Sequence, residues 1–117
     1  MNIKEFYDKI GSDYNEVLGR LNSESLIIRL VKKFSADPTF GDLTDGFEKN
    51  DAEKAFRAAH TLKGLCSNLG FDCLFRPAYD LTEKLRGRTF DVAETTESYN
   101  EVKKQYAFIT ESIKELD

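Results

Sequence analysis

Residues 52–70 read AEKAFRAAHTLKGLCSNLG, and their pattern indicates how the chain folds. Its apolar side chains recur at spacings of 3, 4, 3, 4 and 3, the period of an α-helix that buries one face. Asp51 can cap the start of such a helix, and Gly70 suits the left-handed residue that often follows its end. The stretch therefore predicts one long amphipathic helix. Its core stripe consists of Ala52, Ala55, Ala59, Leu62, Cys66 and Leu69.

The remainder of the chain has the same helical spacing, and no stretch alternates with the period of two that a half-buried strand shows. Asp37-Pro38 interrupts one helical pattern, so that 24–34 and 39–49 form either two helices or one bent helix. Two short helices are expected within 2–21, the second of them beginning after Ser12 or Asp13. A further helix is expected from a capping Asp72 to Gly87, with a bend at Pro77. The apolar face of the last helix runs from Tyr99 to Leu116.

These elements predict an all-α fold. Short connections between long amphipathic helices favour antiparallel neighbours, so we expect an up-and-down four-helix bundle over residues 23–116 with short additional helices over 2–21. The whole chain of 117 residues, 40% of them hydrophobic, has the size of a single domain with a core of its own.

Composition also limits where the protein works. Two cysteines, Cys66 and Cys73, are too few for a disulfide framework and favour a reducing compartment, so we expect both to be small buried hydrophobic residues. The longest apolar run, Tyr106 to Ile109, is far shorter than a membrane span, and residues 1–5 do not begin a signal peptide. We therefore expect a cytoplasmic protein that does not bind a membrane.

The charges are unevenly distributed along the chain. The net charge is -4, which argues against general binding of nucleic acid, but residues 54–88 carry 7 basic and 3 acidic side chains and are locally positive. The flanking residues 1–53 and 89–117 are each acidic. The basic middle segment is therefore where we expect an anionic partner.

His60 is the only histidine of the chain and lies outside the core stripe. At 100° per residue it points about 140° away from the centre of the stripe, toward solvent. Its neighbours on that side of the helix are Arg57, Lys63, Gly64 and Ser67. Cations and small side chains therefore surround an accessible imidazole.

Such an arrangement suits phosphoryl transfer. An exposed neutral imidazole is a nucleophile near physiological pH and can accept a phosphoryl group on a ring nitrogen. Lys63 would offset the added negative charge, and Gly64 would leave bare backbone where a partner's active site can come close.

The segment Ala59-His60-Thr61-Leu62-Lys63-Gly64, with Gly70 ten residues after the histidine, resembles the signature of histidine-containing phosphotransfer (HPt) domains of two-component phosphorelays. The resemblance implies that His60 exchanges a phosphoryl group with the aspartate of a response-regulator receiver domain. It also implies that a sensor or hybrid histidine kinase belongs to the same relay. Many members place a polar residue of the next helix near the histidine, and Thr82 is the best-aligned position here.

The chain has no glycine-rich nucleotide loop and no acidic cluster of its own beside His60, so we expect a phosphoryl carrier and not an enzyme. It needs no cofactor, because magnesium is expected in the acidic pocket of the receiver partner. We expect a monomer, since one chain has enough helices for a bundle.

Several flanking residues are candidates for partner binding. Phe56 and Phe71 lie within about 40° of the direction of His60 and are either exposed at a docking surface or packed under the N-terminal helices. Arg57 either contributes positive charge or pairs with Glu53, and Ser67 offers a hydrogen bond at the rim.

Two other functions would fit a helical chain. One is an adaptor bundle that binds a partner helix and carries no phosphate. The other is the dimerisation and phosphoacceptor portion of a sensor kinase, which builds its bundle from two chains. A metal site at His60, Cys66 and Cys73 is disfavoured, because Cys66 points about 120° away from His60 around the helix.

Overall fold

The computed structural model describes residues 1–87 and 92–117. Within these two ranges every regular element is a helix, which confirms the all-α prediction. The helices are α1 (Ile3–Lys9), α2 (Tyr14–Leu21), α3 (Glu24–Phe34), α4 (Thr39–Glu48), α5 (Ala52–Leu69), α6 (Asp72–Leu85) and α7 (Val92–Ile113).

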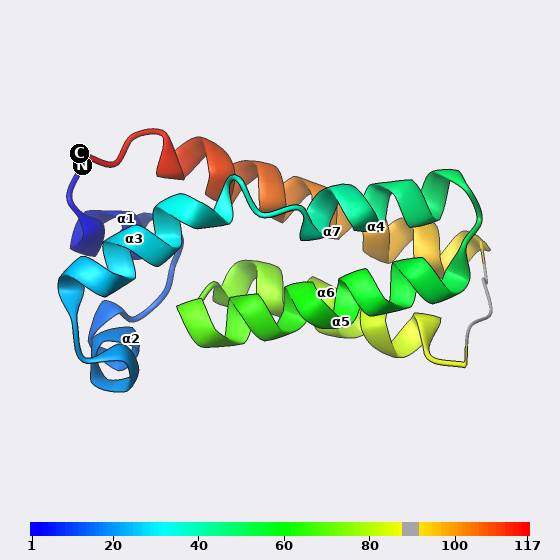
Figure 1. The fold of residues 1–117 in the computed structure, drawn as a ribbon, viewed down its shortest axis with the longest axis horizontal. Coiled ribbons are helices and arrows are strands. Elements are labelled where there is room, and N and C mark those ends of the chain that lie inside the picture. Colours follow the sequence, from blue (N-terminus) through cyan, green and yellow to red (C-terminus); the bar gives the residue numbers. More distant parts are fainter. Residues whose placement is uncertain (88–91) are drawn as a thin grey trace.

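Helices α4 to α7 form the expected four-helix bundle (Figure 1). The central helix α5 packs against α4 and α6, and α6 packs against α7. Aromatic pairs join α4 to α7, among them Phe47 and Tyr99, whose stacked rings have centroids 4.2 Å apart. The predicted stripe of α5 is buried from Ala55 onward, so it forms one wall of the core, as expected.

Helices α3 and α4 are two separate helices, which answers the question that the sequence left open. The chain turns at Asp37 and Pro38, and the Asp37 carboxylate accepts a hydrogen bond of 2.8 Å from the backbone N–H of Thr39. This contact satisfies one of the free donors at the start of α4. Figure 1 shows that α3 lies beyond α4 along the long axis of the molecule, at the end that holds α1 and α2.

The caps of α5 follow the sequence. Asp51 accepts a hydrogen bond from the N–H of Lys54, and Gly70 ends the helix with φ of +72°. A side chain at Gly70 would also collide with α2, since an added Cβ would lie 2.4 Å from Val17 Cγ2. The glycine therefore serves both the backbone conformation and the packing.

The start of α6 differs from the prediction. Asp72 is the first residue of the helix and not its cap; the cap position is Phe71, which makes no side-chain cap hydrogen bond. The N–H of Asp72 instead donates to Ser12 Oγ at 3.4 Å. The hydroxyl of Ser12, which lies between α1 and α2, therefore takes the place of a local cap. The carboxylate of Asp72 still lies in the first turn, where the helix dipole favours negative charge.

Helices α4 and α5 come unusually close at Gly46. A Cβ built on this buried glycine would lie 2.7 Å from the backbone nitrogen of Ala55. No side chain fits between the two backbones at that distance, so the contact depends on glycine in α4 and alanine in α5.

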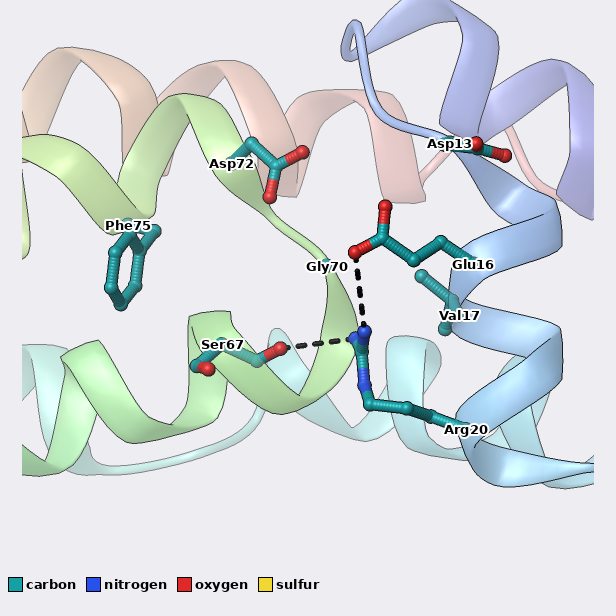
Figure 2. Close-up of a pocket in the computed structure, with 8 residues that line it drawn as sticks. All are labelled: Asp13, Glu16, Val17, Arg20, Ser67, Gly70, Asp72 and Phe75. Carbon is teal, nitrogen blue, oxygen red and sulfur yellow. Dashed lines mark hydrogen bonds and ion pairs between the residues drawn. The ribbon is translucent and has the colours of Figure 1, made fainter.

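The N-terminal helices close the end of the bundle at which α5 stops. The hydroxyl of Tyr7 donates a buried hydrogen bond of 2.6 Å to the carbonyl of Leu69. Arg20 donates to the carbonyls of Ser67 and Asn68 at 3.1 and 3.0 Å, beside a small pocket between α2 and the α5–α6 turn (Figure 2). The last carbonyls of α5, which have no partner within a helix, are thereby satisfied.

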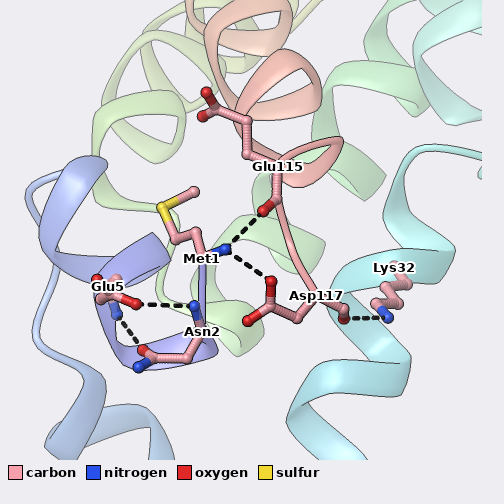
Figure 3. A network of polar contacts seen from close by, with 6 residues as sticks. All are labelled: Met1, Asn2, Glu5, Lys32, Glu115 and Asp117. Carbon is pink, nitrogen blue, oxygen red and sulfur yellow. Dashed lines mark hydrogen bonds and ion pairs between the residues drawn. The ribbon is translucent and has the colours of Figure 1, made fainter.

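The first and last residues of the sequence lie side by side (Figure 3). The amino group of Met1 donates to the carbonyl of Glu115 at 3.0 Å and to the carboxylate of Asp117 at 2.9 Å. Lys32 of α3 donates to a backbone oxygen of Asp117 at 2.8 Å. These contacts fix the chain beyond α7 to α1 and α3.

Candidate functional site

His60 lies on the solvent side of α5, and its imidazole is exposed. The residues that bracket it in the core stripe, Ala59 and Leu62, are buried against the bundle. The prediction that the only histidine lies outside the core is therefore confirmed.

The imidazole of His60 has an aromatic ring one turn earlier on the same helix. The rings of Phe56 and His60 are stacked, with centroids 6.1 Å apart and 19° between their planes. The guanidinium carbon of Arg86, which follows the end of α6, lies 5.4 Å from the centroid of Phe56. A cation from the neighbouring helix thus lies over the ring that flanks the histidine, an arrangement that the π-electrons stabilise.

Lys63 is on the same side of α5 as His60, three residues further on. Its Nζ lies 5.5 Å from the centroid of the Tyr79 ring on α6, and the lysine is half-buried by this contact. Tyr79 is 42% exposed, and its ring packs at 6.1 Å from that of Phe75, one turn earlier on α6. The ammonium group therefore lies over a ring of the neighbouring helix α6.

Glu83 of α6 brings a negative charge to the same place. Its carboxylate accepts two hydrogen bonds from Arg86, of 2.9 and 3.0 Å. Arg86 therefore lowers the pKa of Glu83, and the nearby Lys63 ammonium lowers it further. The two helices thus place one carboxylate and two permanent cations around the histidine.

Gly64 leaves the surface beside His60 open. An added Cβ at this position would meet no atom of the protein within 4 Å. Its backbone is ordinary helix, unlike that of Gly70, so neither internal packing nor backbone conformation requires glycine here. The helix surface is therefore bare at this position.

Two candidate residues do not reach this surface. Phe71 is fully buried, with its ring 5.0 Å from Phe34 and 6.0 Å from Phe6, so the prediction of a docking role is wrong and the alternative of packing under the N-terminal helices is correct. Thr82 is also fully buried, and its hydroxyl donates to the Ala78 carbonyl at 2.7 Å, which leaves it unable to serve as a surface contact.

The other two candidates are exposed at the surface of α5. Arg57, three residues before His60, lines a pocket between α4 and α5 together with Lys54 and Thr61. Ser67 is two turns beyond His60, and its backbone carbonyl is bound by Arg20.

Sequence reasoning missed Tyr79 and Glu83 of α6 and Arg86 directly after it. The spacing of four places Tyr79 and Glu83 on one face of the helix, which the sequence reveals. Which face of α6 lies beside His60 depends on the crossing of α5 and α6, and no pattern in the sequence fixes that crossing. Thr82, the position that the sequence indicates, is therefore interior, and its neighbour Glu83 is the residue close to Lys63.

The cysteines contribute nothing to this surface. Cys66 is buried in the core stripe, and desolvation raises the pKa of its thiol; Cys73 is only half-buried, which corrects the expectation that both are buried. Within residues 1–87 and 92–117, no three or more His, Cys, Asp or Glu side chains gather in a way that could hold a metal ion. None of the helices in these ranges is both long enough and apolar enough to cross a membrane.

An α-helical bundle that carries one exposed histidine on its central helix, with cations beside it, has the form of a phosphoryl carrier. The Hpt domain family matches residues 31–112, from within α3 almost to the end of α7 and well over half of the sequence. The chain belongs to this family. Comparison with curated proteins and with solved structures gave no match.

Membership defines the activity of the chain. Hpt domains carry a phosphoryl group on histidine within phosphorelays, and they are carriers and not catalytic enzymes. They interact with receiver domains and with histidine kinases. Helices α1 and α2 lie before the matched residues and are additions to the family's bundle.

Proposed function

We propose that His60 is the phosphoacceptor, which takes a phosphoryl group from the aspartate of a receiver domain or returns one to it. The observation that carries this proposal is that the only histidine of the sequence is exposed on α5 with Lys63 and Gly64 on its flank. In the transfer, a nitrogen of the imidazole attacks the phosphorus of the aspartyl phosphate. A P–N bond forms, the P–O bond breaks and the aspartate carboxylate leaves; the reverse step restores it.

The cations around His60 have an electrostatic role in this reaction. A phosphoryl group adds a charge of about -1.5 to -2, and a single ammonium about 4 Å away offsets each unit of it by about 1 kcal/mol in water and by more near a protein surface. Lys63 is the nearest such group along the helix. Arg86 is bound to Glu83 and so offsets the negative charge that this carboxylate would set against the phosphoryl group.

Gly64 has the role of access. With no Cβ at this position, the backbone of α5 is bare one turn beyond His60, where the edge of a receiver's active site must come within bonding distance of the imidazole. The receiver brings the magnesium ion and the other groups that the reaction needs.

The partner we propose is a receiver domain with an acidic pocket, attracted by the positive segment 54–88. Phe56, Arg57 and Ser67 are the rim contacts of a small, transient interface. The protein acts as a monomer, because one chain completes the four helices of the bundle, and it works in the cytoplasm, without binding nucleic acid or membranes. A sensor-kinase portion would instead need two chains, and sedimentation distinguishes the two arrangements.

The test is the variant His60→Gln. It removes the nucleophile, and it is expected to abolish acid-labile labelling by a phosphorylated receiver while the helical circular-dichroism spectrum and the thermal unfolding remain those of the parent. The matched control is Lys63→Gln, which keeps the histidine and is expected to slow labelling without abolishing it. Labelling that survives in His60→Gln would show that His60 is not the phosphoacceptor.

A further inference from the structure

Tyr79 is one of two large hydrophobic side chains that are exposed in the described part of the chain. Lys63 Nζ lies over its ring, 5.5 Å from the ring centroid. Phe75 supports the ring from the preceding turn of α6, at a centroid distance of 6.1 Å. Tyr79 is therefore packed against Phe75 at the surface, and its ring contacts the ammonium of a lysine on α5.

The ring holds the ammonium on the side where His60 lies. Glu83 is one turn beyond Tyr79 on α6, and its carboxylate is close enough to both Lys63 and His60 for each to lower its pKa. Lys63 and His60 are three residues apart on α5 and so share one side of that helix. The contact with Tyr79 thus crosses the α5–α6 interface next to the imidazole.

A surface lysine without such a contact samples many rotamers and spends little time at any one place. A cation–π contact at an exposed site favours the bound rotamer over the others by about two- to fivefold. This preference adds little to the stability of the fold. It does, however, substantially change the average distance between the ammonium and a neighbouring group.

We propose that Tyr79 is a positioning residue, whose ring keeps the Lys63 ammonium beside His60 before the phosphoryl group arrives. The inference rests on the proposed role of His60 as phosphoacceptor. The other charged groups around the same place are Glu83 and Arg86 on α6, which bind each other, and Arg57 on the flank of α5. None of these is in the described contact between Lys63 and Tyr79.

The ionisation of the phosphoryl group itself reports the position of the ammonium. Phosphoramidate can phosphorylate His60 without a protein partner: the new P–N bond forms at the imidazole, the P–N bond of the donor breaks and ammonia leaves with the imidazole proton. A ³¹P NMR titration of the phosphoprotein then follows the change from monoanion to dianion. A nearby cation favours the dianion and lowers the midpoint.

Lys63→Gln is expected to raise this midpoint by about 0.7 pH unit, the value for one charge about 4 Å away in water. Tyr79→Leu keeps apolar bulk but loses the ring, and should raise the midpoint by about half as much. Tyr79→Phe keeps the ring and should leave the midpoint unchanged. In the Lys63→Gln background, Tyr79→Leu should have no further effect, because the tyrosine acts through the lysine.

Three results would overturn the proposal: an unchanged midpoint in Tyr79→Leu, a lowered midpoint, or an equal rise in the Lys63→Gln background. The second would mean that the ring keeps the ammonium away from the phosphoryl group. Failure of the underlying function gives a different result, since phosphoramidate would then produce no phosphohistidine in the parent protein. The measurement uses no receiver, so a role of Tyr79 in docking cannot imitate the expected pattern.

Discussion

Substitution of Gly64 separates the needs of the fold from the needs of the reaction. An added Cβ at Gly64 meets nothing within 4 Å, and the residue is in the interior of α5 with ordinary helical backbone. Glycine in a helix interior is about 1 kcal/mol less favourable than alanine. Gly64→Ala is therefore expected to stabilise the protein by about that amount, which raises Tm by about 4 °C for a domain of this size.

The same substitution should impair transfer, and more so with a longer side chain. A group that shifts the reacting atoms by about 1 Å can cost a rate factor of about 100, so Gly64→Gln should lower the rate of transfer from a phosphorylated receiver by about two orders of magnitude. Gly64→Ala should lie between Gly64→Gln and the parent. Labelling by phosphoramidate, a donor of few atoms, should change far less, because it can reach the imidazole past the new side chain.

Gly19→Ala is the matched control. This glycine is exposed in α2, has open space around it and is on a different helix from His60, so its substitution should stabilise the helix without slowing transfer. The measurements are thermal unfolding and rapid-quench transfer kinetics on the three variants. A loss of stability in Gly64→Ala, or transfer at the parent rate in Gly64→Gln, would refute the role assigned to the open surface.

Three further substitutions test the packing. Gly46→Ala would force a Cβ to 2.7 Å from the Ala55 nitrogen, and should lower the unfolding free energy by about 1 to 3 kcal/mol in urea titration, the reverse of Gly64→Ala. Tyr7→Phe leaves the Leu69 carbonyl without its buried donor, and a loss of about 1 to 2 kcal/mol is expected by the same assay; no loss would mean that water replaces the hydroxyl. Hydrogen bonds from two lysines lower the pKa of Asp45, so its contribution to stability is present above about pH 4 and is lost as pH falls through the lower pKa of the folded state. The difference in stability between the parent and Asp45→Asn should therefore shrink in acid, and a difference independent of pH would contradict this.

The fold could be predicted largely because the helical spacing of apolar residues dominates the sequence. The stripe from Ala55 to Leu69 gave the central helix, its buried face and both of its ends, since Asp51 and Gly70 act locally. The start of α6 could not be found in this way, because the group that receives the Asp72 N–H is a serine sixty residues earlier. Local signals locate an end only when its partner is local.

The candidate site also has a part that the sequence predicts and a part that it does not. The exposure of His60 and the open backbone at Gly64 follow from the geometry of a single helix, and the structure agrees with both. The direction expected for Phe71 does not hold, because the helix ends at Gly70 and the 100° period no longer describes the next residue. Tyr79 and its neighbours on α6 depend on how two helices cross, and that is decided by the core between them and not by the surface residues themselves.

The described groups around the imidazole all stand on α5 or α6, or directly after α6 at Arg86, and these two helices are consecutive in the chain. A single helical hairpin, residues 52–86, therefore holds all of these side chains, while α4 and α7 complete the bundle against which it packs. Transplanted onto another pair of supporting helices, that hairpin should keep its histidine chemistry. The identity of its recognised partner could then be changed by altering the rim alone.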